Sequence, residues 1–217
     1  MNVQNSDAGQ VVRHAVSQAS GHTQPYRHWL LKDVLPDYVC DSLIEWMPDA
    51  KAVSGDIQGR RENNNQNRVF VNPQKQEEDQ RCVALAQAFE AQETRDLFSK
   101  ITGADLSDTW LRLELCLDKE GFWLEHHTDI GAKKLTFLIS LSLGEDAESW
   151  GTDIMNAQGE SLARSPGVFN SAFLFIPGKD TWHGYQKRPM SGIRRTLIMN
   201  YVDKSWRAKH ELAFSYD

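Results

Sequence analysis

Residues 110–202 carry the pattern that most restricts how this chain can fold. Apolar residues recur at every second position there, which is the period of a half-buried β-strand. In 111–117, leucines at the odd positions alternate with Arg112, Glu114 and Cys116, so one face is aliphatic and the other polar. Turn residues, such as Pro177-Gly178, separate several segments of this kind. Seven or eight short strands at this spacing indicate a β-sandwich or barrel.

The individual strands can be placed approximately from the same pattern. After 110–117 we expect strands at 122–129, 134–143, 150–155, 171–178, 181–186 and 194–202, with turns over 159–167. Arg112 and Glu114 share one face of the first strand. Either they line an interior cavity, paired with each other or touching a ligand, or they form an ion pair that faces solvent.

Two motifs within these strands carry metal-binding side chains. In the first, His127 and Asp129 stand two positions apart, so on a strand both side chains leave the same face. In the second, Trp182-His183-Gly184-Tyr185, a further imidazole follows. Two histidines and one carboxylate on one face of an octahedral ion are the ligand set of non-haem Fe(II) oxygenases. His126 points away from His127 and is excluded as a ligand. The alternative is that these histidines only cap strands.

A third motif is Gly192-Ile193-Arg194, whose arginine lies eleven positions after His183. With the three motifs in this order, residues 110–202 resemble the Fe(II)/2-oxoglutarate-dependent dioxygenases, within the group that includes the prolyl hydroxylases. The resemblance implies an enzyme that is mainly β, with a double-stranded β-helix (jelly roll) behind N-terminal helices.

The resemblance also implies which side chains hold the iron and the co-substrate. Fe(II) would be held by His127, Asp129 and His183, which form the catalytic centre. 2-Oxoglutarate would chelate the iron through its keto acid end, with a basic side chain on its far carboxylate. Arg194 and Arg195 compete for that role, because only one of two neighbours on a strand faces the cavity; the G-x-R placement favours Arg194.

Three more residues are candidates for the 2-oxoglutarate pocket. Thr196 shares the strand face of Arg194 and would add a hydroxyl to the same carboxylate. Tyr185 lies two positions after His183 and either lines the pocket or packs in the barrel. Thr136 lies near the co-substrate by its position in the family pattern.

The implied reaction is hydroxylation of an unactivated C–H bond with O2, releasing succinate and CO2, with ascorbate as a possible reductant. Halogenating relatives lack the carboxylate that Asp129 supplies. A small-molecule substrate is favoured, and the alternative is a peptidyl (prolyl-type) hydroxylase. Two further readings are a non-catalytic jelly-roll protein that binds a metal or ligand, and a cupin-like dioxygenase that needs no 2-oxoglutarate. Cupins usually use three histidines.

The first half of the chain is expected to support this core. We interpret 1–24 as a flexible tail, with a short helix at most, and 25–217 as a single oxygenase domain. Within it, 25–106 would be mostly helical support and 107–203 the jelly-roll core. We expect a short strand at 26–31, a helix over 36–47 that Pro48 ends, and a solvated loop or substrate flap at 54–67. A short strand at 68–71 and one long helix from 72 to 101 would follow.

Charge and cysteine content restrict the partners and the compartment. A net charge of −6 argues against a nucleic-acid or anionic-membrane partner, since phosphate binding needs a basic face. The 3 cysteines have no C-x-x-C spacing and are expected to be reduced thiols. With no signal-peptide pattern and no apolar run of about 18 residues, a cytoplasmic location without membrane association is expected. The sequence leaves the oligomeric state open.

Overall fold

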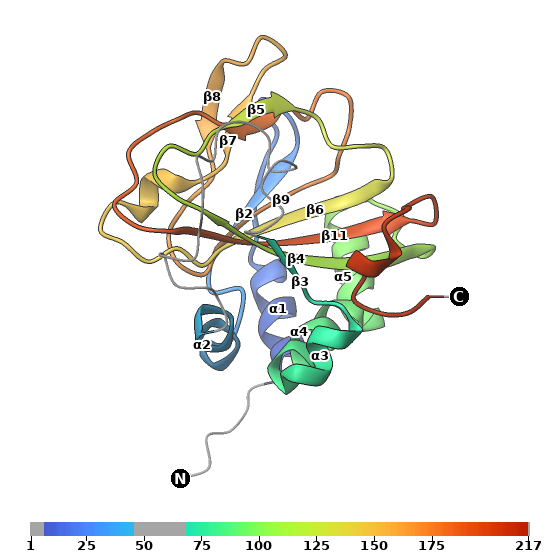
Figure 1. Ribbon diagram of the computed structural model, residues 1–217. Coiled ribbons are helices and arrows are strands. Elements are labelled where there is room, and N and C mark those ends of the chain that lie inside the picture. The colour runs from blue at the N-terminus through green and yellow to red at the C-terminus, as the bar shows by residue number, and fades with distance from the viewer. Residues whose placement is uncertain (1–6, 46–67, 217) are drawn as a thin grey trace.

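Two antiparallel sheets face each other, and helices cover the outer face of the larger sheet (Figure 1). The computed structural model describes residues 7–45 and 68–216. The predicted loop at 54–67 and the helix end at Pro48 lie outside these ranges. The predicted class, mainly β with N-terminal helices, is confirmed, and the two-sheet arrangement is that of a jelly roll.

The larger sheet has the strand order β1-β2-β9-β6-β11-β4-β3, and the smaller has β5-β10-β7-β8. The strands of the larger sheet are β1 (Ser20–His22), β2 (His28–Leu31), β9 (Ser171–Phe175), β6 (Lys133–Ser140), β11 (Arg194–Asp203), β4 (Thr109–Asp118) and β3 (Arg68–Phe70). Those of the smaller sheet are β5 (Leu124–His127), β10 (His183–Tyr185), β7 (Asp153–Met155) and β8 (Ser161–Arg164).

Two strand predictions need correction. Strand β5 ends at His127, so Asp129 lies in the loop that follows and not on the strand. Residues 161–164, where we expected only turns, form β8, which pairs with β7. Its side chains are all exposed, so the apolar alternation that marks a strand is missing there.

The alternation seen in β4 decides which face of the larger sheet meets the helices. Its leucines belong to the main hydrophobic core together with residues of the helices, whereas Arg112 and Glu114 line a cavity on the other face. Phe89 and Phe98 place their rings 6.2 and 5.5 Å from the ring of Phe137 on β6. The aliphatic half of the pattern therefore faces the helices, and the polar half lies on the cavity side.

In the described residues, five α-helices precede β4, and several of them lie against the larger sheet (Figure 1). They are α1 (Ala8–Ser17), α2 (Asp37–Glu45), α3 (Pro73–Glu78), α4 (Gln80–Glu90) and α5 (Gln92–Thr102). Short 3-10 helices occupy Ala147–Trp150 and Lys209–Glu211. In the parts of the chain that the structure describes, no helix is long and apolar enough to cross a membrane.

The helical region corrects two predictions. Residues 8–17 of the expected flexible tail form a packed helix, since Val12 and Val16 are fully buried, one turn apart on one face, and residues 20–22 form β1. The expected single helix from 72 to 101 is three helices. The chain leaves helical geometry at Asp79, where the backbone is extended, and at Ala91, and the Asp79 carboxylate accepts from the Arg81 amide to start α4. An N-cap of this kind satisfies backbone N–H donors at the start of a new helix. A helix can therefore end and a new one begin at Asp79 although the apolar residues continue at helical spacing.

Gly151 joins the 3-10 helix to β7 where two backbone segments touch. A Cβ added there would lie 1.6 Å from the carbonyl oxygen of Ser165. Because that oxygen belongs to the backbone, relief requires moving a whole segment. We expect Gly151→Ala to lower the free energy of unfolding by more than about 2 kcal/mol, measured by urea denaturation. Gly131→Ala is the matched control, since its Cβ would meet nothing within 4 Å; equal losses in both variants would contradict the prediction.

Candidate metal centre and its two cavities

The two predicted histidine ligands are direct cross-strand neighbours. His127 on β5 pairs with His183 on β10, and their ring centroids lie 4.4 Å apart. Opposed residues of an antiparallel pair bring their Cβ atoms to about 5 Å, so the pairing register alone places both imidazoles together.

Backbone carbonyls fix the orientation of both rings. The Nδ1 of His127 lies 2.8 Å from the carbonyl oxygen of Glu125, and the Nδ1 of His183 lies 2.9 Å from that of Thr181. A carbonyl oxygen only accepts, so each Nδ1 carries the proton and each Nε2 offers a lone pair. Metal-binding histidines are held in their tautomer by this kind of bond.

Asp129 reaches the histidines from its loop because β6 holds its carboxylate. Lys133 forms an ion pair with it at 2.6 Å, and the hydroxyl of Thr136 donates to it at 2.6 Å. The side-chain amide of Asn200 in turn donates to the Thr136 hydroxyl at 3.0 Å. Burial alone would raise the pKa of the Asp129 carboxyl, but Lys133, His183 and the hydrogen bonds outweigh it, and the pKa falls below its usual range. Asp129 is therefore ionised.

His127, Asp129 and His183 can each offer one ligand atom, and these atoms all lie within 4.8 Å of one another. Two neutral imidazoles and an ionised carboxylate form a donor set that suits Fe(II). The three side chains therefore fit the metal that the sequence implied. His126 is not part of this group; its ring lies 5.4 Å from that of Trp182, as expected from its opposite orientation.

Burial of His183 makes the stability of the metal-free protein depend on pH. It lowers the pKa of His183 from 6.5 to about 4, against the opposing charge of Asp129. The unfolded chain therefore binds this proton more readily. The contribution of His183 to stability is complete above pH 6.5 and is lost as the pH falls toward 4, by about 3 kcal/mol in all.

We expect urea unfolding of the metal-free protein to show this loss between pH 7 and pH 4.5. The control is His183→Gln, in which the histidine component of the pH dependence is absent. Equal pH dependence in the two proteins would contradict the assignment.

An inner cavity of about 60 Å³ lies beside the metal-ligand group. The three candidate metal ligands line it. So do all four residues predicted for the co-substrate, which are Thr136, Tyr185, Arg194 and Thr196. Strand β11 contributes Arg194 and Thr196, which are both buried.

Arg194 is held in place by a buried ion pair and by the 3-10 helix. Its Nη1 lies 2.5 Å from the Asp118 carboxylate, its Nε donates to the Trp150 carbonyl at 2.7 Å, and its Nη2 lies 3.2 Å from the Thr152 hydroxyl. A guanidinium has five N–H donors, so two have no partner among the described residues and could bind a ligand carboxylate. Arg195 points elsewhere, is half-buried and does not line the cavity.

Tyr185 brings a buried hydroxyl into the same cavity. The side chain is 1% exposed, and its hydroxyl has no hydrogen-bond partner among the described residues. The guanidinium groups of Arg188 and Arg194 lie 4.2 and 4.7 Å from its ring centroid. Burial raises the pKa of Tyr185, which keeps the phenol protonated. An unpaired phenol beside two remaining guanidinium donors fits the far carboxylate of 2-oxoglutarate.

A second, outer cavity of about 450 Å³ shares His127 and Asp129 with the inner one. Arg112 and Glu114 line it and form an ion pair at 2.6 Å, each side chain 3% exposed. Of the alternatives left open by the sequence, the cavity-lining pair is the one found. The metal-ligand group thus lies where an inner and an outer cavity meet.

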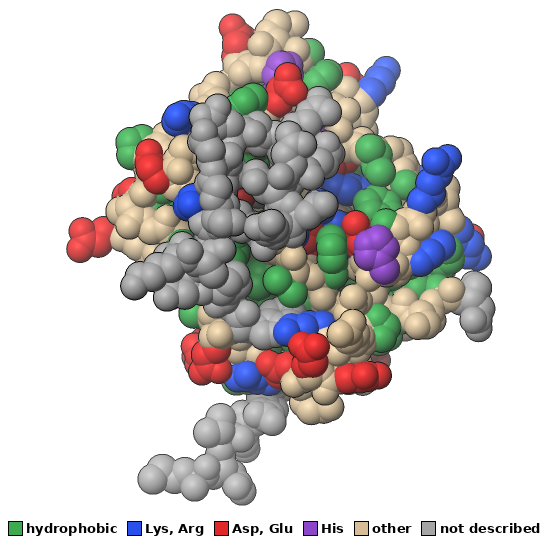
Figure 2. Space-filling model, in the orientation of Figure 1, with side chains coloured by type: hydrophobic (Ala, Val, Ile, Leu, Met, Phe, Trp, Pro, Cys, Tyr) green, Lys and Arg blue, Asp and Glu red, His purple; other side chains and the backbone are tan. Residues whose placement is uncertain are grey.

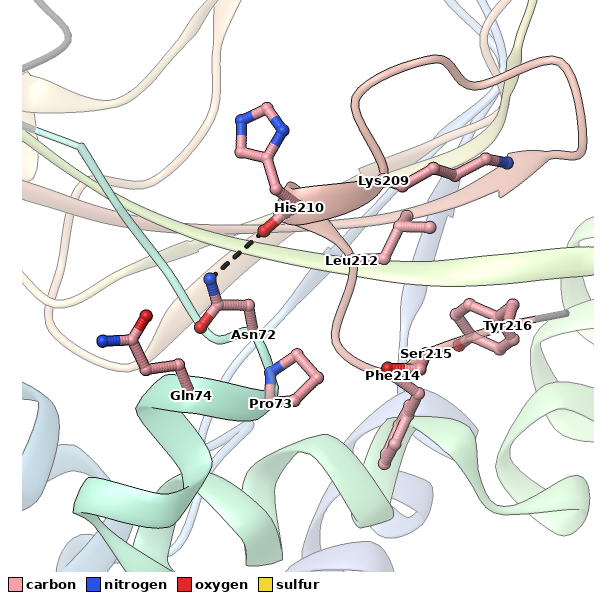
Figure 3. Close-up of a pocket in the computed structure, with 9 residues that line it drawn as sticks. All are labelled: Asn72, Pro73, Gln74, Lys209, His210, Leu212, Phe214, Ser215 and Tyr216. Carbon is pink, nitrogen blue, oxygen red and sulfur yellow. Dashed lines mark hydrogen bonds between the residues drawn. The ribbon is translucent and has the colours of Figure 1, made fainter.

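Another hollow, of about 400 Å³, lies away from the metal-ligand group. Figure 3 shows residues of the start of α3 and of the C-terminal segment around it, with Asn72 donating to the His210 carbonyl at 3.1 Å. On the face in Figure 2, basic and acidic side chains of the described residues are interspersed. None of the metal-ligand residues lines this hollow.

Sequence reasoning missed the residues that hold the site together. Lys133 stands four positions after Asp129, a spacing that offered a signal. Asp118, Thr152 and Asn200 offered none, because their roles follow from pairing between strands distant in sequence.

No protein-family model matches the sequence, and no curated protein matches it. Solved structures do. A prolyl-4-hydroxylase from Pseudomonas putida is 14% identical with a TM-score of 0.58, over 91% of this chain and 95% of that one. The viral collagen prolyl hydroxylase from Paramecium Bursaria Chlorella virus-1 is 14% identical with a TM-score of 0.55, over 81% and 89%.

A third similar structure is a prolyl hydroxylase from Trichoplax adhaerens, in complex with a hypoxia inducible factor oxygen degradation domain peptide fragment. It is 13% identical with a TM-score of 0.53, over 90% of this chain and 89% of that one. Identities this low establish shape and not activity. The resemblance predicted from the sequence is thereby confirmed at the level of architecture: the chain has the fold of the prolyl hydroxylases.

Proposed function

We propose that the chain is an Fe(II)- and 2-oxoglutarate-dependent oxygenase that hydroxylates an unactivated C–H bond of a small molecule. The observation that carries the proposal is the convergence of His127, Asp129 and His183 beside a cavity that contains Arg194. Similarity to solved prolyl hydroxylases supports it through the shared fold.

The residues of the chain divide the work between the two cavities. His127, Asp129 and His183 would hold the metal, with Lys133 and Thr136 orienting the carboxylate. Arg194 and Tyr185, with Thr196 beside them, would hold the far carboxylate of 2-oxoglutarate in the inner cavity. When bound, Fe(II), 2-oxoglutarate and O2 supply the oxidising power for hydroxylation, with succinate and CO2 as co-products and ascorbate as the proposed reductant.

A peptidyl hydroxylase is the second candidate. It is supported by the Trichoplax adhaerens prolyl hydroxylase, which has a similar fold and is in complex with a peptide fragment. The two candidates differ in what must enter the outer cavity: a whole small molecule, or one side chain of a longer chain that continues across the surface.

The test is anaerobic titration of the metal-free protein with Fe(II) and then with 2-oxoglutarate, followed by the visible metal-to-ligand charge-transfer band. The expected result is a band that saturates at one 2-oxoglutarate per protein. Bound iron without a band would overturn the 2-oxoglutarate assignment and favour the cupin-like reading. No bound iron would favour the non-catalytic binding protein. Succinate release with small molecules or with proline-containing peptides then separates the two candidate substrates.

A further inference from the structure

One wall of the outer cavity is a chain of four alternating charges. The Nε of Arg68 donates to the Glu114 carboxylate, and the Nη2 of Arg112 lies 2.6 Å from the other oxygen of the same group. The Nε of Arg112 then donates to Glu211 at 2.6 Å. In the order Arg68–Glu114–Arg112–Glu211, this row of side chains is cationic at one end and anionic at the other.

The two inner members of this chain are occupied by protein groups. The guanidinium of Arg112 lies 5.1 Å from the ring centroid of Phe70 and 5.1 Å from that of Trp206. The Glu114 carboxylate also accepts from the Cys116 thiol at 3.0 Å. With side chains only 3% exposed, Arg112 and Glu114 offer little to a ligand.

The two end members keep bonding capacity on the cavity wall. The Arg68 side chain is 17% exposed, and its two terminal nitrogens have no hydrogen bond to the described residues. The Glu211 side chain is 15% exposed, and its Oε1 has no hydrogen bond to the described residues. The indole nitrogen of Trp206 is buried without a hydrogen-bond partner in the described part of the chain. Among the described residues, a guanidinium fork and a carboxylate oxygen on the cavity wall are therefore left without hydrogen-bond partners.

The charges of the described residues that line this cavity balance. Three are cationic and three anionic: Arg68, Arg112 and Lys133 against Glu114, Asp129 and Glu211. A ligand with a single charge would meet one favourable end of the wall and one unfavourable end. A ligand that is neutral overall but carries both charges satisfies both ends.

The backbone sets how far apart those two charges must be. Arg68 pairs with Cys116 on β4, and Leu212, next to Glu211, pairs with Arg112. These attachments are four positions apart on β4, about 13 Å at the rise of a strand. Arg68 bonds to Glu114 and Glu211 bonds to Arg112, so the ion pair between Arg112 and Glu114 lies between the two outer side chains. An ammonium and a carboxylate on the same carbon cannot span that pair.

Resting on the proposed function, we propose that the substrate is a small zwitterion whose ammonium and carboxylate are several bonds apart, as in an ω-amino acid or a dipeptide. Its carboxylate would bind Arg68 and its ammonium would bind Glu211. The carbon chain between them would lie along the apolar cavity liners Leu124, Ile198 and Trp206, beside the metal ligand His127.

The test measures binding to the metal-free protein by calorimetry at pH 7, so it does not depend on iron or 2-oxoglutarate. The probes are 4-aminobutanoate, 6-aminohexanoate and glycylglycine, with hexanoate and hexylamine as single-charge counterparts. We expect at least one zwitterion to bind ten-fold or more tightly than both counterparts.

Two variants then assign the charges. Arg68→Gln should weaken binding of the zwitterion and of hexanoate about ten-fold and leave binding of hexylamine unchanged. Glu211→Gln should weaken binding of the zwitterion and of hexylamine about ten-fold and leave binding of hexanoate unchanged. Arg81→Gln and Glu78→Gln, which remove members of exposed ion pairs outside the cavity, are the matched controls.

The outcomes separate this inference from the proposed function. Failure of every zwitterion to bind, or equal weakening of all probes by both variants, would overturn the zwitterion assignment even if the charge-transfer band forms. Zwitterion binding without that band would instead overturn the proposed function and leave a ligand site.

Discussion

Replacing Asp129 with alanine is expected to abolish turnover of 2-oxoglutarate and to weaken Fe(II) binding by more than about 100-fold. Loss of a group that merely orients a metal ligand costs 10- to 100-fold, and Asp129 is the only anionic ligand in the group that the described residues form. The measurement is Fe(II) affinity by anaerobic titration, followed by succinate release. A variant that kept wild-type affinity would show that the metal is not held here.

Asp203→Ala is the matched control for this variant. Asp203 pairs with Lys134 at 2.9 Å, as Asp129 pairs with Lys133 at 2.6 Å, but it lines neither of the two cavities at the metal-ligand group. It should leave Fe(II) affinity and turnover unchanged. Comparison of the two variants separates loss of a metal ligand from loss of an ion pair with a lysine at the start of β6.

Arg194→Ala is expected to lower the free energy of unfolding by about 3 to 5 kcal/mol and to remove 2-oxoglutarate binding. The side chains of Arg194 and Asp118 are 5% and 3% exposed, so the substitution removes the guanidinium from beside a buried carboxylate. Urea denaturation of the metal-free protein measures the first effect, and the charge-transfer band measures the second.

The neighbouring Arg195→Ala is the control for position. Arg195 is half-buried, and among the described residues its side chain donates only to the carbonyl of Ile193, at 3.4 Å. We therefore expect a loss below about 1 kcal/mol and an unchanged band. Equal effects of the two alanine variants would contradict the strand register on which the site depends.

A double variant separates stability from binding at Arg194. Arg194→Met combined with Asp118→Asn removes both charges, and replacing both members of a buried pair costs far less than removing one. It should recover most of the lost stability, while 2-oxoglutarate binding stays absent because the guanidinium is gone. Recovery of the band in the double variant would show that Arg194 acts only through the fold.

The class of fold could be predicted from the sequence, and so could the three residues that come together as a candidate metal-ligand group, because both depend on local rules. Alternation of side chains across a strand follows from backbone geometry, and it correctly divided β4 into a core face and a cavity face. The same alternation placed Arg194, and not Arg195, toward the inner cavity. His127 and His183 could be recognised as candidate metal ligands from their residue type and from the order of the motifs.

Other features could not be predicted because they depend on contacts between segments far apart in sequence. The helix at residues 8–17 is held by burial of Val12 and Val16 in the common core, which a short polar-looking segment does not reveal.

The sequence by itself determined the β-rich class of this protein, the identity of its three candidate metal ligands and the arginine that faces them. Only the tertiary structure decided that Asp129 reaches the histidines from a loop, held by Lys133 and Thr136. Only the tertiary structure set Asp118 against Arg194. The physical reason is register: residue type and alternation are encoded locally, whereas the side chains that meet across a cavity are fixed by which residues pair between distant strands.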